Sequence, residues 1–396
     1  MKRIILLISF LTLIFISWFV MGYLKLFQTS SVPSAAPAII QAQKLTPATE
    51  IKPQGYQLQV VATGLYVPWS LVFTDNNRLL VTERSGAIRQ IKDGILAKTP
   101  LITFPEASQI SEEGLLGLEK DPQYQQNHFL YTILTYQKNK TTLLNKVLRL
   151  IDQGDKITVD KILLDGIPAA KYHAGGRIKF GPDGKLYLTT GDAQNGPIAQ
   201  DKNSLGGKIL RLNSDGSIPS DNPFNSPVYS LGHRNPQGLA WYPPTNQLFI
   251  TEHGPSGTDG PGGGDEINLI VKGGNYGWPL VHHDQSKPGL ISPLIQFTPA
   301  EAPAAALFYQ GNLFPEFSNN FLFAALKGEG IIRIILDPTD PSKIISYQKL
   351  PFVAVGRIRD LIEGPEGAIY FTTSNRDGRG TVRKGDDKIY KIVPSN

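Results

Sequence analysis

Apolar and polar residues alternate with a short period along most of the chain, in pairs of brief runs joined by tight turns. The clearest pair is IKFGPDGKLYLTT, which starts at Ile178 and has a Gly-Pro-Asp-Gly turn at its centre. Proline fixes φ in such a turn, and Asp-Gly tolerates the tight reversal. The pattern therefore predicts antiparallel strand hairpins rather than long helices.

This hairpin recurs along the chain, and most copies are followed by a third apolar strand such as GKILRL or DEINLI. The six copies begin at Leu71, Leu116, Ile178, Leu239, Leu307 and Leu361. Repeated four-stranded units of about 40–50 residues are typical of propeller blades, whereas a two-sheet sandwich needs no sixfold repeat. We predict an all-β fold, a six-bladed β-propeller over residues 55–396, with residues 56–65 helping to close the ring.

The start of the chain has a different pattern. After Lys2 and Arg3, residues 4–24 contain no charged side chain. As a helix they would extend about 31 Å, close to the roughly 30 Å hydrocarbon core of a bilayer. We predict a signal or anchor segment over residues 1–27 and a Ser/Pro/Ala-rich tether over 28–54, with a cleaved signal peptide as the alternative. The propeller would be exported, to the periplasm or cell surface, and would meet the membrane through the N-terminal segment only.

Composition narrows the possible chemistry. The chain has no cysteine, which excludes disulfides, thiolate metal sites and cysteine nucleophiles. The net charge is +5, but no basic run of the kind found in nucleic-acid binders is present, so no nucleic-acid partner is predicted. A local use of this charge, such as a site for an anionic cofactor, and a slightly basic solvated surface are both open.

His173 is the first candidate for chemistry, since it lies beside two glycines just before a predicted strand. A neutral imidazole can act as a general base near physiological pH. The second strand of this hairpin returns antiparallel, so Asp192 in TTGD comes back towards His173 and could hold the ring tautomer. A histidine that only caps a strand is an equal alternative.

Two further clusters precede or follow predicted strands. LGHRNPQG carries His233, Arg234 and Asn235. The glycine-dense stretch EHGPSGTDGPGGGDEINLI, residues 252–270, would expose carbonyl oxygens, which are ligands for hard cations such as calcium. From the sequence alone, a flexible surface loop explains that stretch equally simply.

The last cluster is cationic. Lys327 follows a predicted strand of the fifth unit, and Arg357 and Arg359 begin the sixth. Residues two apart share one face of a strand, and paired arginines suit carboxylate ligands. Their apolar neighbours weaken the alternative of a solvated surface charge.

Seven segments occur in a recognisable order: EEGLLGL, HAGGRIKFGPDGKLYLTTGD, LGGKILRL, GHRNPQGLA, EHGP with GGDEINLI, GGNYGWP and GRIRDLIEGPEG. Together they resemble the soluble glucose/sorbosone dehydrogenase family, especially its aldose sugar dehydrogenase branch, which uses pyrroloquinoline quinone (PQQ). The resemblance covers about Gly55 to Asn396. It implies a six-bladed propeller that oxidises aldose sugars to lactones and passes electrons to an external acceptor.

The resemblance also implies roles for residues named above. His173 would be the general base, supported by Asp192. Arg234 and Asn235 would contact PQQ, the arginine stabilising negative charge on its reduced oxygen.

The other implied contacts of the cofactor are with its carboxylates and with a metal. The cationic ligands of the carboxylates would be Lys327, Arg357 and Arg359. The carbonyls of Gly254 and Pro255 would bind a calcium ion that polarises the quinone. Gly175 and Gly176 would let a planar cofactor approach the backbone closely.

One position departs from the family pattern. Glu112, in SEEGLLG, stands where sugar-oxidising members carry glutamine. A carboxylate there adds negative charge near substrate or cofactor, which would raise the pKa of His173 or change the choice of sugar.

Two other functions compete with a dehydrogenase. One is a non-catalytic propeller ectodomain that binds a carbohydrate or protein partner. The other is a calcium-dependent lactone hydrolase, which would need several carboxylate or amide ligands on the channel axis. The dehydrogenase is favoured because all six candidate residues are present: His173, Asp192, Arg234, Lys327, Arg357 and Arg359.

Overall fold

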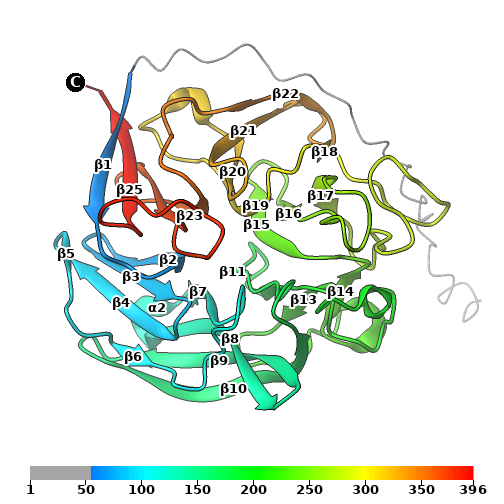
Figure 1. Ribbon diagram of the computed structural model, residues 1–396, viewed down its shortest axis with the longest axis horizontal. Coiled ribbons are helices and arrows are strands. Elements are labelled where there is room, and N and C mark those ends of the chain that lie inside the picture. The colour runs from blue at the N-terminus through cyan, green and yellow to red at the C-terminus, as the bar shows by residue number, and fades with distance from the viewer. Residues whose placement is uncertain (1–54, 396) are drawn as a thin grey trace, which may run out of the picture. The chain divides into compact units, whose positions relative to one another are not determined.

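The computed structural model describes residues 55–395. The predicted anchor and tether, residues 1–27 and 28–54, lie outside this range. In the part of the chain that is described, no helix is long and apolar enough to cross a membrane. The strands of residues 55–395 form six sheets, and Figure 1 shows their first strands gathered around a common centre. The predicted six-bladed β-propeller is confirmed.

Blades one to three are built from consecutive strands, each starting next to the central axis. Blade one contains β2 (Pro68–Asp75), β3 (Arg78–Glu83), β4 (Ala87–Lys92), β5 (Ile95–Leu96) and β6 (Ile102–Thr103). Blade two contains β7 (Leu115–Lys120), β8 (Phe129–Asn139), β9 (Thr142–Asp152) and β10 (Ile157–Ala169). Blade three contains β11 (Ile178–Phe180), β12 (Leu186–Thr190), β13 (Lys208–Leu212) and β14 (Val228–Leu231).

Blades four to six follow the same plan. Blade four contains β15 (Pro236–Tyr242), β16 (Gln247–Glu252), β17 (Asp265–Ile270) and β18 (Ile295–Phe297). Blade five contains β19 (Pro303–Phe308), β20 (Phe321–Ala325), β21 (Gly330–Leu336) and β22 (Ile344–Lys349). Blade six contains β23 (Ile358–Glu363), β24 (Ile369–Thr373), β25 (Ile389–Pro394) and β1 (Tyr56–Ala62).

The N-terminal strand closes the ring, as predicted. β1 pairs antiparallel with β25, so the first and last described strands belong to one sheet. The helical elements are single short turns: α2 (Tyr124–Asn127), η1 (Gly196–Ala199), η2 (Pro223–Asn225) and η3 (Pro315–Phe317). Because the secondary structure is almost entirely strand and turn, loops carry the chemistry.

The core consists of hydrophobic clusters, one at each junction between neighbouring blades. At the junction of blades four and five, for example, Phe249 packs with Phe308 and Phe321. Burying such apolar surface stabilises the fold by about 25 cal/mol per Å². Each blade is thereby fixed against two others, which gives the loops a rigid support.

A buried ion pair crosses the centre. Arg177, just before β11, places Nη1 2.8 Å from Oδ1 of Asp360 in β23, and both side chains are buried. The Arg177 guanidinium also lies 4.3 Å from the ring of Trp69. Blades one, three and six are therefore linked at the axis, next to the cavity that Trp69 lines.

Candidate active site

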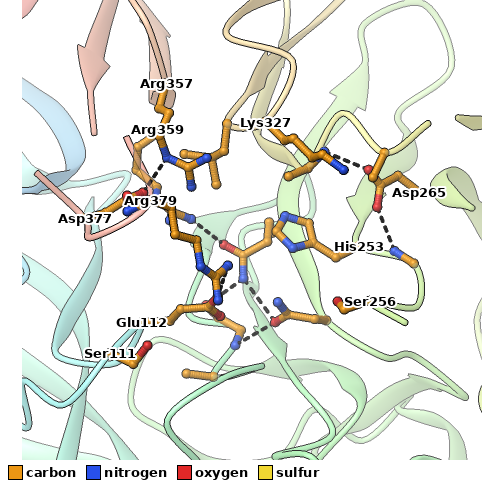
Figure 2. A pocket seen from close by; sticks show the side chains of 18 of the residues that line it. Ser111, Glu112, His253, Ser256, Asp265, Lys327, Arg357, Arg359, Asp377 and Arg379 are labelled. Atoms are coloured by element: carbon orange, nitrogen blue, oxygen red, sulfur yellow. Dashed lines mark hydrogen bonds and ion pairs between the residues drawn. The ribbon is translucent and has the colours of Figure 1, made fainter. Parts of the chain in front are cut away.

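A cavity of about 410 Å³ lies at the end of the propeller where the loops that precede the inner strands meet the loops that follow the second strands. This volume is within the range of about 300–1,000 Å³ typical of small-molecule sites. Its walls carry more cations than carboxylates (Figure 2). The cations are Arg84, Lys327, Arg357, Arg359 and Arg379, and the carboxylates are Glu112, Asp265 and Asp377.

Many lining residues come directly after the second strand of a blade. Arg84 follows β3, His253 follows β16, and Lys327 lies two residues after β20. This position places the three side chains in the wall of the cavity. Sequence analysis missed Arg84 and His253, although their place after a strand that ends in TE was a usable signal.

His173 and Asp192 are brought together, as predicted. His173 Nδ1 lies 2.8 Å from Asp192 Oδ1, and the other oxygen of Asp192 accepts a hydrogen bond of 2.8 Å from Trp278 Nε1. Because a carboxylate faces Nδ1, that nitrogen carries the hydrogen and Nε2 keeps its lone pair. Among the residues described, Nε2 has no hydrogen-bond partner. The ring is thus held at one nitrogen and available at the other.

The backbone at His173 is unusual, with φ of +59°. This left-handed conformation is uncommon for residues other than glycine and often occurs at functional sites. Gly191 explains how His173 reaches Asp192, since a Cβ at Gly191 would lie 1.9 Å from the His173 carbonyl oxygen. The glycine in TTGD is therefore required for this pair.

The glycines beside His173 also lie close to other segments of the protein, and the expected close approach of a cofactor stays a prediction. A Cβ on Gly175 would lie 2.6 Å from the carbonyl oxygen of Thr189, and a Cβ on Gly176 would lie 2.4 Å from Leu116 Cδ1. Both glycines also have positive φ. They allow close packing of protein segments, although Gly175 does line the cavity.

His173 itself stands at the side of the cavity. Its neighbours Ala174 and Gly175 are lining residues, whereas its ring is not, and its side chain is 13% exposed. Asp192 and Arg234 are also absent from the lining. The remaining predicted residues are cavity-lining: Glu112, Asn235, Gly254, Pro255, Lys327, Arg357 and Arg359.

The three predicted cations meet in one cavity but differ in their partners. Arg357 Nε binds Asp377 Oδ2 at 2.8 Å. Arg359 is buried, and its Nε has no hydrogen-bond partner in the described chain. Lys327 makes no hydrogen bond or ion pair through its ammonium there. Burial lowers the pKa of Arg359 to about 10, so it remains protonated at neutral pH.

Gln237 connects the cofactor-binding candidates, and sequence analysis missed it. Its Oε1 accepts a hydrogen bond of 3.1 Å from Arg359 Nη1, and its Nε2 donates to Asn235 Oδ1 at 3.1 Å. Asn235 Oδ1 also accepts from the Gly175 amide at 3.1 Å. Asn235 and Arg359 are therefore held in one network.

Glu112 is an ion-pair partner in this structure. Its Oε1 lies 2.8 Å from Arg379 Nη1, and its Oε2 accepts the backbone N–H of His173 at 3.3 Å. The negative charge that the sequence places here is therefore balanced by Arg379, a residue that sequence analysis did not single out.

His253 lines the cavity and is held as a neutral ring. Nε2 donates to the Pro303 carbonyl at 2.8 Å. Burial, reinforced by the charges of Arg359 and Arg234, keeps its pKa well below the usual value. His253 is thus an uncharged acceptor at Nδ1 among cations.

Arg234 is covered by the glycine-rich loop. Its Nε binds Asp259 Oδ2 at 2.7 Å, and its Nη2 donates to Ser256 Oγ at 2.9 Å. Ser256 lines the cavity, whereas Arg234 lies behind Ser256 and is not a lining residue. The side chain predicted to contact the cofactor is therefore occupied by the protein.

The predicted calcium ligands offer few oxygens. The Pro255 carbonyl accepts the Gly263 amide at 3.2 Å. Residues 55–395 contain no group of three or more His, Asp or Glu side chains suited to a metal. Calcium takes six to eight oxygen ligands, so the carbonyls of Gly254 and Pro255 do not make a site by themselves.

A family model for glucose/sorbosone dehydrogenases matches residues 65–384. The chain belongs to the glucose/sorbosone dehydrogenase family. This membership makes it an oxidoreductase of the sugar dehydrogenase type, which confirms the resemblance seen in the sequence.

Individual relatives agree with this family assignment. The chain is 31% identical to the aldose sugar dehydrogenase YliI of Escherichia coli, over 89% of this chain and 96% of that one. It is 30% identical to the quinoprotein glucose dehydrogenase B of Acinetobacter calcoaceticus, over 87% and 91%. The PQQ-bound aldose sugar dehydrogenase of Streptomyces coelicolor superposes with a TM-score of 0.75 at 34% identity, covering 88% of this chain and all of that one.

Proposed function

We propose that this protein oxidises aldose sugars at the anomeric carbon, giving lactones, with PQQ as the hydride acceptor and an external molecule as the final electron acceptor. The observation that carries the proposal is the His173–Asp192 pair, with Nε2 free, beside a cation-rich cavity. The names of the relatives above support the cofactor and the substrate class.

The residues fit a tricarboxylate such as PQQ. Lys327 has no ion-pair partner in the described chain, and the buried Nε of Arg359 lacks an acceptor. An unsatisfied buried donor costs about 1–3 kcal/mol, which a ligand carboxylate would remove. Arg357 would supply the third cation, and Asn235 a polar contact held by Gln237.

The chemistry of this chain centres on one proton. When bound, PQQ would supply an electron-poor carbonyl carbon as the acceptor for the hydride of the anomeric C–H bond. His173 Nε2 takes the proton of the anomeric hydroxyl, and the ring becomes a cation. Asp192 stabilises that cation through Nδ1–H and keeps the ring oriented. General-base catalysis of this kind contributes about 10²–10⁴-fold in rate.

Two further parts of the proposal rest on the sequence. We propose that calcium binds at the carbonyls of Gly254 and Pro255 only together with ligand oxygens, and no step above depends on it. We also propose export to the periplasm or cell surface, with residues 4–24 as the membrane tether.

A non-catalytic binding propeller is less well supported, because binding alone does not require a histidine held at Nδ1 and free at Nε2.

The test is turnover by the purified fragment from Gly55. PQQ and calcium are added, a panel of aldoses is supplied, and dye reduction is followed. We expect cofactor-dependent turnover that falls at least 10²-fold in His173→Ala. The matched control is His128→Ala, an exposed histidine in the turn between β7 and β8, which should retain full activity. Failure of the wild-type protein to bind PQQ would contradict the proposal.

A further inference from the structure

The loop of residues 256–262 is attached to the protein through one side chain. Arg234 Nε binds Asp259 Oδ2 at 2.7 Å, and Arg234 Nη2 donates to Ser256 Oγ at 2.9 Å. Asp259 Oδ1 accepts the Ser256 amide at 2.9 Å, which closes a ring of three residues. No other hydrogen bond joins residues 256–262 to the rest of the described chain.

The remainder of this loop has few packing contacts. A Cβ on Gly257 or Gly262 would meet no atom within 4 Å, and residues 256–259 are exposed. Apolar packing therefore does little to hold the loop in place. The ion pair between Asp259 and Arg234 is its main attachment.

The loop also separates Arg234 from the cavity. The Arg234 side chain is 3% exposed, whereas Ser256 is a lining residue. An anion in the cavity would have to displace Ser256 and Asp259 to reach the guanidinium. Asp259 already supplies the carboxylate that an anionic ligand would otherwise bring.

We propose that Asp259 is an internal counter-ion that competes with the anionic cofactor for Arg234, so that the residue sets cofactor affinity and the loop is released on binding. This inference rests on the proposed function, because it takes PQQ as the ligand. It assigns Asp259 a role in affinity and not in the proton transfer at His173.

The test compares PQQ dissociation constants of the wild-type protein and Asp259→Asn by quenching of tryptophan fluorescence. The variant keeps the size of the side chain and removes its charge. We expect binding to be about fivefold tighter, the effect of a partly exposed ion pair of about 1 kcal/mol. Asp340→Asn, which removes one negative charge from the turn after β21, where the Asp340 side chain is 39% exposed, should leave the dissociation constant unchanged.

A second readout follows the loop itself. Amide hydrogen exchange should rise on PQQ binding at Ser256 and Gly263, whose amides donate to Asp259 Oδ1 and to the Pro255 carbonyl, and should already be faster in Asp259→Asn without PQQ. Equal or weaker PQQ binding by Asp259→Asn would overturn the inference and make Asp259 a residue that orients Arg234. If the wild-type protein does not bind PQQ, the proposed function fails and this inference with it.

Discussion

Blades three and four contain the same histidine–carboxylate pair in two different settings. In each, a histidine before the inner strand pairs through Nδ1, at 2.8 Å, with a carboxylate 19 residues later at the end of the second strand. His173 pairs with Asp192 and His233 with Glu252. The geometry of the pair is the same, so geometry alone does not identify the catalytic one.

The difference lies at the second ring nitrogen. His233 Nε2 is 2.8 Å from Ser230 Oγ, and the ring is fully buried and stacked on Tyr276 at 4.8 Å between centroids. His173 Nε2 has no partner among the described residues, and its side chain is partly exposed. A general base needs an accessible lone pair, so of these two histidines only His173 meets the requirement. His233 is a structural element that ties β14 to the end of β16.

The largest expected effect tests the catalytic pair. In Asp192→Asn, the amide can donate a hydrogen to Nδ1, which places the ring hydrogen on Nε2 and removes the base. We expect kcat to fall by about 10²–10⁴-fold while PQQ affinity changes little. Steady-state kinetics with an aldose and a fluorescence titration with PQQ measure the two quantities. A kcat within tenfold of the wild-type value would show that Asp192 does not set the tautomer.

The second prediction tests the structural pair. His233→Ala removes one of three donors to the buried Glu252 carboxylate, which keeps the Arg234 amide and Asn268 Nδ2, and it leaves a buried cavity beside Ser230. We therefore expect the free energy of unfolding to fall by about 3 kcal/mol. His173→Ala should cost only about 1 kcal/mol, because water can replace the ring at that partly exposed position. Urea denaturation measures both, and kcat per folded molecule should survive only in the His233 variant. Equal losses of stability would mean that the two pairs have the same structural role.

Much of this arrangement could be predicted from local sequence. The hairpin starts follow from a two-residue period and Pro-Asp-Gly turns, and the approach of Asp192 to His173 follows because an antiparallel hairpin returns to its origin. The predicted cations do line one cavity.

The rest depends on contacts between blades, which no local pattern encodes. Gln237 contacts Gly175 and Arg359, 62 and 122 residues away. Arg234 is covered by the loop of residues 256–262, whose sequence has no alternation of apolar and polar residues from which its position could be predicted. The free Nε2 of His173, which separates it from His233, is visible only when every neighbouring element is in place.

The third prediction concerns another histidine whose ring is held at one nitrogen, His253. Its pKa is depressed in the folded protein and near 6.5 in the unfolded chain, so below pH 6.5 the unfolded chain binds a proton that the folded protein excludes. Its contribution to stability is therefore complete above pH 6.5 and is lost as the pH falls. From pH 7.5 to 5, wild type should lose roughly 2 kcal/mol more than His253→Gln. Urea denaturation at the two pH values measures this, and parallel losses would mean that His253 titrates normally.

The smallest effect is expected at Glu112, which contacts the backbone of His173 and is paired with Arg379. Since Arg379 balances its charge and half of the arginine side chain is exposed, Glu112→Gln should change stability by less than about 1 kcal/mol. It should leave kcat within a few-fold of wild type. Combining Glu112→Gln with Arg379→Gln in a double-mutant cycle isolates the ion pair, which should contribute little to kcat. A kcat change above tenfold in Glu112→Gln alone would mean that the carboxylate acts on the His173 ring, and the contrast between the two histidines would then depend on charge as well as on access.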